Sequence, residues 1–219
     1  MSTLKDAIDR YNEQKIQRVP SEILHAMAQA TAELKTSGIE QRAVHIGDQM
    51  PDFELPNQYH ERRRFTDYLQ KSPVVLNIYR GGWCPYCNLE MKALHQALPQ
   101  IEALGAQLVG MAPETPDKAR ATAQSHQINI DILSDADNQV AERLGLVFTL
   151  PDYLRPLYEN LGIDIPAYNG EASFKLPVPA TYIVQQDGLI AHAFVNADYT
   201  QRLEPAEIVA HLQALAAIA

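Results

Sequence analysis

The chain is poor in cysteine, in positive charge and in long hydrophobic runs, and each shortage excludes a class of protein. Two cysteines in 219 residues exclude a small secreted domain held together by disulfides. The formal net charge of −9 argues against nucleic acid as a partner, since no basic stretch offsets it. Apolar runs such as 74–76 are too short to span a bilayer, so no membrane partner is expected.

The N-terminus also lacks the features of an export signal. Charged residues interrupt its first ten positions, where a secretory signal would carry a continuous apolar core. We therefore expect a cytoplasmic protein. The length and the 46% hydrophobic content fit one domain with an appendage.

Amphipathic helices and apolar strands make up most of the chain. Two helices are expected in the first forty residues, the second capped by Ser21 and ended by Gly38. We interpret residues 1–45 as a helical extension that packs on the main domain or across a homodimer, and residues 46–219 as that main domain. Strands are expected in 46–55, 73–79, 107–112, 130–133, 181–184 and 189–195.

Helices separate these strands, and the order of elements predicts an α/β sheet whose later strands turn antiparallel. The longest helix follows the strand at 73–79, and Pro99 is expected to kink or split it. The insertion at 148–176 is expected to hold a helical turn near 154–161, because loops of this length usually carry helices or act as lids.

The two cysteines stand three residues apart, directly after the strand expected at 73–79. Cys84 then falls at the first turn of the following helix, where unpaired backbone N–H groups and the helix dipole stabilise a thiolate. Pro85 suits that turn because its missing N–H would be unpaired there in any case. Cys87 lies one turn further on and can reach Cys84 to close a disulfide. This Cys-x-x-Cys pattern is typical of a reactive thiol pair.

Zinc binding and chance burial are the alternatives for two such cysteines. A zinc site needs two more ligands, and the seven histidines lack the His-x₃₋₅-His spacing that would supply them. Chance burial does not explain why the pair stands between a strand and a helix. We therefore expect redox chemistry with no metal and no cofactor. Such chemistry requires the two sulfur atoms to be close together and not deeply buried.

Four segments together resemble the alkyl hydroperoxide reductase/thiol-specific antioxidant family, over about residues 46–215. They are 48–53 (Asp-Gln-Met-Pro-Asp-Phe), 83–87 (Trp-Cys-Pro-Tyr-Cys), 134–135 (Ser-Asp) and 179–184 (Pro-Ala-Thr-Tyr-Ile-Val). The turn at 80–87 is similar to that of peroxiredoxin-like members with Arg-Gly-x-Trp-Cys-Pro-x-Cys. The resemblance implies a thioredoxin-like, three-layer fold with a central mixed sheet.

The family resemblance also implies an activity, that of a thiol-dependent peroxidase. Cys84 would attack hydrogen peroxide or an organic hydroperoxide and become a sulfenic acid, and Cys87 would condense with it to a disulfide. Thioredoxin or a similar dithiol would then restore both thiols. Trp83, Tyr86 and Thr181 are expected to line the site.

Two positions depart from the peroxiredoxin pattern. Peroxiredoxins place a proline seven residues and a threonine or serine three residues before the peroxidatic cysteine, and this chain has Asn77 and Gly81 there. Without a hydroxyl group at Gly81, a strong peroxidase activity is in question. The arginine that peroxiredoxins bring from a neighbouring strand has no counterpart in 179–182. Arg80 is then a candidate substitute, or equally a surface residue at a strand end.

The same turn is similar to that of membrane-tethered thiol-disulfide oxidoreductases with Trp-Cys-x-x-Cys-x-x-Glu, which supports reduction of protein disulfides as an alternative activity. Those proteins carry an export signal, which we do not expect here. Glu90 stands at the position of their glutamate. It could exchange a proton with the thiols, or it could be a solvated helix residue. Val178-Pro179 resembles the cis-proline that thioredoxin-like folds set opposite the cysteine turn. A redox sensor, whose helices engage a partner on oxidation, is a third hypothesis.

Overall fold

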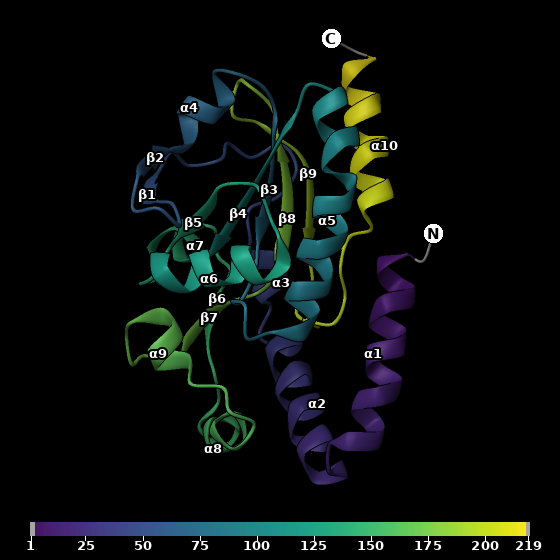
Figure 1. The fold of residues 1–219 in the computed structure, drawn as a ribbon, viewed down its shortest axis with the longest axis vertical. Helices are drawn as coiled ribbons and strands as arrows, with labels where there is room; N and C mark the ends of the chain where they lie inside the picture. Colours follow the sequence, from purple (N-terminus) through teal and green to yellow (C-terminus); the bar gives the residue numbers. More distant parts are fainter. Residues whose placement is uncertain (1–2, 218–219) are drawn as a thin grey trace.

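A five-stranded mixed sheet forms the centre of the computed structural model, which describes residues 3–217 (Figure 1). The strands lie in the order β5-β4-β3-β8-β9. β3, β4 and β5 are parallel, whereas β8 and β9 are antiparallel to their neighbours, as the sequence predicts. The strand bounds are β3 (Val74–Ile78), β4 (Gln107–Ala112), β5 (Ile132–Ser134), β8 (Ala180–Val184) and β9 (Ile190–Val195).

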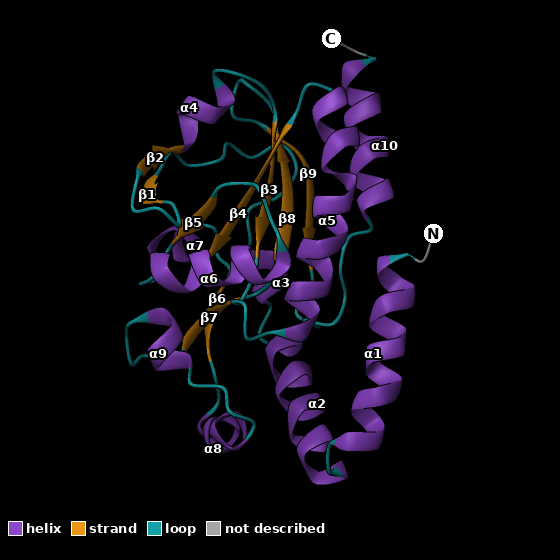
Figure 2. Ribbon diagram, viewed as in Figure 1, coloured by secondary structure: helices purple, strands orange, loops and turns teal. Residues whose placement is uncertain are grey.

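Helices cover both faces of this sheet and complete the predicted three-layer fold (Figure 2). Successive residues of a strand point to opposite faces, so Val75 enters one core and Leu76 the other. The first core lies under α5 (Pro85–Ala103), α6 (Pro116–His126) and α10 (Pro205–Ala216). The second lies under α3 (Ile39–Arg42), α4 (Phe65–Leu69) and α7 (Gln139–Arg143).

The N-terminal extension forms two long helices, as predicted, and they lie as a hairpin at one end of the fold (Figure 1). α1 (Leu4–Arg18) opens with a capping box and buries Leu4 and Ile8 in the core under α5. α2 (Ser21–Thr36) begins at Ser21 itself. The prediction that Ser21 caps this helix is therefore wrong. Pro20 is the cap, because its backbone already has the extended ψ of 141° that a cap requires.

Helix α5 runs unbroken through Pro99, so the helix is not split within its assigned range of 85–103. Pro99 lies in the last turns of the helix and is exposed to solvent. Water can therefore reach the carbonyl group that the missing N–H leaves unpaired. The continuous helix places both cysteines and Glu90 on one rigid element.

The insertion at 148–176 is closed at its base by a pair of short strands that the sequence did not predict. β6 (Val147–Thr149) pairs with β7 (Lys175–Pro177). A helical turn was expected near 154–161, and α8 (Arg155–Asn160) confirms it. The insertion also holds the 3₁₀ helix η1 (Asp152–Leu154) and α9 (Ile165–Asn169), and a further hairpin joins β1 (Glu54–Pro56) to β2 (Arg62–Arg64). The apolar side of the insertion packs against α2.

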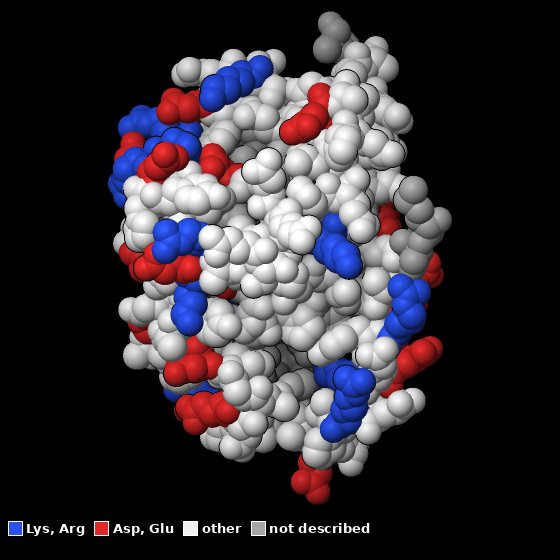
Figure 3. Space-filling model, in the orientation of Figure 1, with Lys and Arg blue, Asp and Glu red and all other residues white. Residues whose placement is uncertain are grey.

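The surface carries charge of both signs. On the face drawn in Figure 3, Lys and Arg are interspersed with Asp and Glu, and a broad uncharged area lies between them. Within residues 3–217, no helix is both long and apolar enough to cross a membrane. In the same range, no group of three or more His, Cys, Asp and Glu side chains could hold a metal ion.

Candidate active site

The cysteine turn joins the end of β3 to the start of α5, as predicted. Cys84 is the N-cap residue, with φ and ψ of −90° and 113°, and Pro85 opens the helix. The N–H of Cys84 donates to the carbonyl of Gly81 over 3.0 Å and closes the turn. The Cys84 side chain therefore lies where the unpaired N–H groups of a 19-residue helix meet. Both cysteines are free thiols in this structure.

Two glycines explain why the position before the turn carries no hydroxyl group. Gly81 has a φ of 134°, which side chains rarely adopt, and a Cβ there would lie 2.6 Å from Trp83 Nε1. A Cβ on Gly82 would lie 2.1 Å from Thr122 Oγ1. The Gly82 N–H also donates to the buried carboxylate of Glu114 over 2.6 Å. The loop is packed so closely that threonine cannot replace Gly81 without moving it.

Arg80 supplies the positive charge at Cys84. Its Nη2 donates to Cys84 Sγ over 3.1 Å, and the residue is 3% exposed, so the surface-arginine alternative is wrong. The guanidinium carbon lies 4.0 Å from the ring centroid of Tyr199 and 5.0 Å from that of Trp83. These cation–π contacts hold the guanidinium group in place.

The electrostatic balance favours the thiolate at Cys84. Burial opposes ionisation of this thiol. The hydrogen bond from Cys87 and the charges of Arg80 and Arg202 outweigh burial, and they hold the pKa of Cys84 well below its ordinary value. The surroundings of Cys84 therefore favour its thiolate over its thiol, and the thiolate is the nucleophilic form of cysteine.

Cys87 has an arginine of its own, Arg202, which sequence reasoning missed. Arg202 Nη2 lies 3.5 Å from Cys87 Sγ, and its Nε donates to Glu90 Oε2 over 2.7 Å. Burial, the hydrogen bond to Cys84 and the charge of Cys84 together raise the pKa of Cys87 well above its ordinary value. No local pattern marks Arg202, because it lies between β9 and α10, 112 residues from Glu90.

Glu90 is buried, so the alternative of a solvated helix residue is wrong. It is 2% exposed and forms a buried ion pair with Arg202. Burial raises the pKa of Glu90 to about 7, although the charge of Arg202 opposes this shift. Glu90 lies three residues beyond Cys87 and so shares its face of the helix. That face points into the fold rather than into solvent.

Asn77, which stands where peroxiredoxins have proline, joins a buried polar network. Its Nδ2 donates to Thr181 Oγ1 over 3.1 Å, and its side chain also hydrogen-bonds Glu90. A proline at this position could make neither bond. Thr181 is 1% exposed and belongs to this network behind the cysteines. Asn77 thus replaces the family proline with a side chain that holds Glu90.

Pro179 follows a trans peptide bond, so the prediction of a cis-proline is wrong. Within residues 3–217 every peptide bond is trans. Only Val178 and Pro179 separate β7 from β8, and the N–H of Val178 donates to the carbonyl of Leu146 over 2.8 Å. The two-residue connection from β7 to β8 is extended, and a trans peptide bond before Pro179 is compatible with it. Pro179 nevertheless lies beside the site, since it lines the same cavity as Arg80.

Both cysteines are fully buried, which contradicts the expectation that they are within reach of substrate. Helix α1 covers the turn from outside. The hydroxyl of Tyr86 donates to Asn12 Oδ1 over 2.6 Å, and Lys15 Nζ donates to the same hydroxyl over 3.4 Å. The ring of Tyr11 stands edge-on to that of Tyr86, 5.1 Å away. Because Cys84 is 0% exposed, a substrate reaches its sulfur only after this cover or Arg80 moves.

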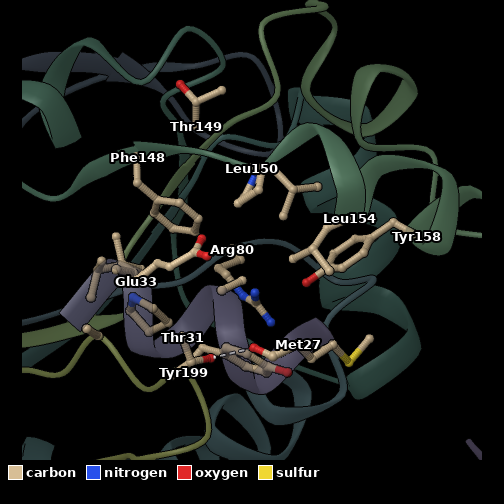
Figure 4. A pocket seen from close by; sticks show the side chains of 16 residues that line it. Met27, Thr31, Glu33, Arg80, Phe148, Thr149, Leu150, Leu154, Tyr158 and Tyr199 are labelled. Atoms are coloured by element: carbon tan, nitrogen blue, oxygen red, sulfur yellow. Dashed lines mark hydrogen bonds between the residues drawn. The ribbon is translucent and has the colours of Figure 1, made fainter. Parts of the chain in front are cut away.

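A largely apolar cavity of about 200 Å³ opens beside Arg80 (Figure 4). In this view, Arg80 lies between Tyr199 on one side and Leu154 and Tyr158 on the other. Tyr158 also contacts the ring of Trp83 edge-on, with centroids 5.8 Å apart. The cavity is therefore next to the residues that surround Cys84, although Cys84 itself does not line it.

A strand, a cysteine turn and a helix on a mixed sheet define the class of protein, a thioredoxin-like fold with a dithiol site. The comparisons with known proteins are specific. Residues 46–193 match the AhpC/TSA family. Peroxiredoxin Bcp of Escherichia coli is 25% identical over 148 residues, 68% of this chain and 83% of the relative.

Two further relatives extend this comparison. The thiol:disulfide interchange protein DsbE of Pseudomonas aeruginosa is 26% identical over 154 residues, 69% of this chain and 67% of the relative. The crystal structure of peroxidoxin BcpB from Mycobacterium tuberculosis superposes with a TM-score of 0.60 at 22% identity, covering 78% of this chain and 98% of that one. The last similarity supports the fold.

The chain belongs to the AhpC/TSA family. It is an oxidoreductase of the peroxiredoxin type with a thiol-dependent peroxidase function. The fold and the activity that the sequence motifs imply are thereby confirmed.

Proposed function

We propose that Cys84 is the peroxidatic residue and Cys87 the resolving thiol of a hydroperoxide reductase that thioredoxin or a similar dithiol recycles. One observation carries this assignment. Arg80 Nη2 lies 3.1 Å from Cys84 Sγ at the N-terminus of α5. The pKa of Cys84 is lowered and that of Cys87 is raised, so one sulfur is ready to attack and the other holds its proton.

The reaction has three steps. The Cys84 thiolate attacks the terminal oxygen of the hydroperoxide, the O–O bond breaks, and the leaving oxygen takes up a proton to become an alcohol or water. Sulfur loses two electrons and becomes a sulfenic acid. Cys87, once deprotonated, attacks this sulfur, and a disulfide forms as hydroxide leaves and is protonated to water. The dithiol reductant then reopens the disulfide by thiol–disulfide exchange.

Glu90 and Arg202 serve the resolving step in this proposal. Cys87 must lose its proton before it attacks, and its raised pKa opposes that loss. Glu90 has a pKa of about 7, so it can take up this proton near neutral pH. Arg202 contacts both Cys87 and Glu90 and positions the two groups. Asn77, whose amide also donates to Thr181, hydrogen-bonds Glu90.

Because the resolving thiol already lies one helical turn from Cys84, we expect fast disulfide closure. Cys84 should then resist over-oxidation to a sulfinic acid, which requires a second peroxide to react before closure. Mass spectrometry after a peroxide pulse tests this expectation. The wild type should yield mainly the disulfide, and Cys87→Ser should accumulate sulfinate at Cys84. Mainly sulfinate in the wild type would contradict it.

Reduction of protein disulfides is the second candidate function. The similarity to DsbE favours it, as do the Trp-Cys-x-x-Cys-x-x-Glu residues that the chain shares with thiol-disulfide oxidoreductases. The same two sulfurs would attack a substrate disulfide instead of a peroxide. The redox-sensor hypothesis requires in addition a change in hydrodynamic size on oxidation.

Stopped-flow peroxide consumption by the wild type, Cys84→Ser and Cys87→Ser, each with and without thioredoxin, decides between these functions. The proposal predicts turnover only in the wild type with thioredoxin, and a single turnover in Cys87→Ser. Consumption that survives in Cys84→Ser would remove the mechanism. Negligible peroxide reactivity with rapid reduction of insulin would select the second candidate.

The setting of this activity is also a proposal. We infer a cytoplasmic enzyme with neither nucleic acid nor membrane as a partner, in line with the net charge of −9. Residues 1–45 act as a helical extension of the catalytic domain at 46–219. The amphipathic N-terminal helices are compatible with a homodimer. Sedimentation at several concentrations tests the oligomeric state.

A further inference from the structure

The cavity beside Arg80 is built partly by the N-terminal extension, which lies outside the segment that matches the family. Five parts of the chain meet around it: α2, Arg80 after β3, the insertion, the junction between β7 and β8, and the segment after β9. Most of the lining side chains are apolar. They include Met27, Ala30 and Leu34 from α2, Phe148, Leu150 and Leu154 from the insertion, and Val178 and Pro179 from the junction.

Arg80 connects this cavity to the redox centre. Its side chain lines the cavity, and its Nη2 donates to Cys84 Sγ. Its Nε–H is buried and has no hydrogen-bond partner. An unpaired buried donor of a charged group is costly, so this site favours a ligand with an oxygen acceptor. Within residues 3–217 no carboxylate pairs with this guanidinium to satisfy it.

The shape and charge of the cavity restrict the rest of the ligand. A cavity of about 150 Å³ with apolar walls is large enough for benzene, and this one holds about 200 Å³. Glu33, which is exposed, lines it as well, and hydrogen bonds from Gln29 and Tyr153 lower the pKa of its carboxyl group. A carboxylate on the rim disfavours a second negative charge there. The ligand that fits best is apolar, uncharged and of the size of a substituted ring.

We propose that α2 and the insertion form a substrate pocket that selects bulky, uncharged organic hydroperoxides over hydrogen peroxide. The proposal rests on the peroxidase function assigned to Cys84. The apolar group fills the cavity and the peroxide oxygens accept from Arg80. Movement of the Arg80 side chain then brings them to the sulfur that the same guanidinium contacts. The thiolate takes the terminal oxygen, the O–O bond breaks, and the bulky alcohol leaves after protonation. The N-terminal extension is then a specificity element of the enzyme.

Filling the pocket should remove this preference and spare the chemistry. We compare Ala30→Phe, which lines the cavity, with Ala28→Phe, which lies two residues away on the exposed side of α2. The rate of Cys84 oxidation is measured with cumene hydroperoxide and with hydrogen peroxide. Ala30→Phe should lower the rate with cumene hydroperoxide about tenfold and leave that with hydrogen peroxide within about twofold. Ala28→Phe should change neither rate.

Ala30→Leu, a smaller change, repeats the test if Ala30→Phe does not fold. An equal loss with both peroxides, or an unchanged ratio of the two rates in folded Ala30→Phe and Ala30→Leu, would overturn the proposal. So would a wild type that reacts equally fast with both peroxides.

A binding measurement separates failure of the pocket from failure of the peroxidase function. The probe is 2-phenyl-2-propanol, the alcohol product, which cannot react with a thiol. Its binding is read from the fluorescence of Trp83, the single tryptophan, which contacts Tyr158 at the cavity. Saturable binding to the wild type and Ala28→Phe but not to Ala30→Phe supports the pocket, even in a protein that reacts with no peroxide. Equal binding by all three proteins, or binding by none, refutes it.

Discussion

Cys84 and Cys87 lie one helical turn apart, both fully buried and both in contact with an arginine, yet their acidities shift in opposite directions. The pKa of Cys84 falls and that of Cys87 rises. The arginines differ in what else they contact. Arg202 is paired with Glu90 over 2.7 Å, whereas Arg80 has aromatic rings and the sulfur as its neighbours.

The comparison shows that an arginine beside a buried thiol lowers its pKa overall only where its charge outweighs burial and the interaction with the neighbouring sulfur. At Cys87, burial, the hydrogen bond to Cys84 and the charge of Cys84 together outweigh the charges of Arg202 and Arg80. Cys84 has in addition the helix N-terminus and a hydrogen bond from Cys87. Two identical side chains thus differ in acidity: Cys84 favours the thiolate, and Cys87 favours the protonated thiol. Four substitutions test this difference.

Removing Arg202 should have the largest effect. Arg202→Ala leaves the carboxylate of Glu90 buried without a partner, which costs about 3–5 kcal/mol of folding stability in comparable sites. The free energy of unfolding, measured in urea at pH 7, should fall by this amount. The double variant Arg202→Met/Glu90→Gln should recover most of the loss. If the double variant is no more stable than Arg202→Ala, the ion pair does not explain the role of Arg202.

Removing Arg80 should act on Cys84 rather than on stability. Arg80→Ala should raise the pKa of Cys84 and slow its reaction with hydrogen peroxide at pH 7 about a hundredfold, because little thiolate then remains. Arg80→Lys keeps the positive charge, so its rate of reaction with hydrogen peroxide should fall less than that of Arg80→Ala. The pKa is followed by thiolate absorbance, with Cys87→Ser as the background. An unchanged pKa in Arg80→Ala would show that Arg80 does not cause the low value.

Glu90→Gln should change the pH dependence of stability. The pKa of Glu90 is about 7 in the folded protein and 4.5 as its ordinary value. The folded state therefore binds more protons than the unfolded state in this interval, and its contribution to stability falls as the pH rises. Between pH 5 and pH 7 the wild type should lose about 2 kcal/mol relative to Glu90→Gln. Glu102→Gln, an exposed change on the same helix, is the control and should show no such loss.

Weakening the contact of helix α1 with Tyr86 should have the smallest effect of the four substitutions, and it should change only how readily Cys84 is reached. Asn12→Ala removes the acceptor of the Tyr86 hydroxyl, a hydrogen bond of about 1 kcal/mol. Alkylation of Cys84 by iodoacetamide should become about fivefold faster, because the covered state is less favoured by that energy. Glu13→Ala, an exposed neighbour on α1, should leave the rate unchanged. An unchanged rate in Asn12→Ala would show that Cys84 is reached by another route.

The sequence predicted much of the fold and the centre of the site. The apolar runs at β3, β4 and β8 gave the sheet, and the turn after β3 gave Cys84 at a helix N-terminus. Predictions failed where a distant part of the chain decides. The sequence leaves Glu90 open between a proton-exchanging residue and a solvated one, and only its ion pair with the distant Arg202 decides this. The misplaced cap at Ser21 is different, because the adjacent Pro20 takes that position.

The sequence by itself determined the reactive pair, because strand periodicity, the helix start and the Cys-x-x-Cys spacing are all set within about fifteen residues. Only the tertiary structure decided which arginine contacts each sulfur, how deeply both lie and what covers them. Those properties depend on Arg202, which contacts Cys87 across 115 residues of chain, and on α1, which contacts Tyr86 across 71 and 74 residues. Electrostatic energy in a buried site depends on distance in space, and spacing along the chain does not encode it.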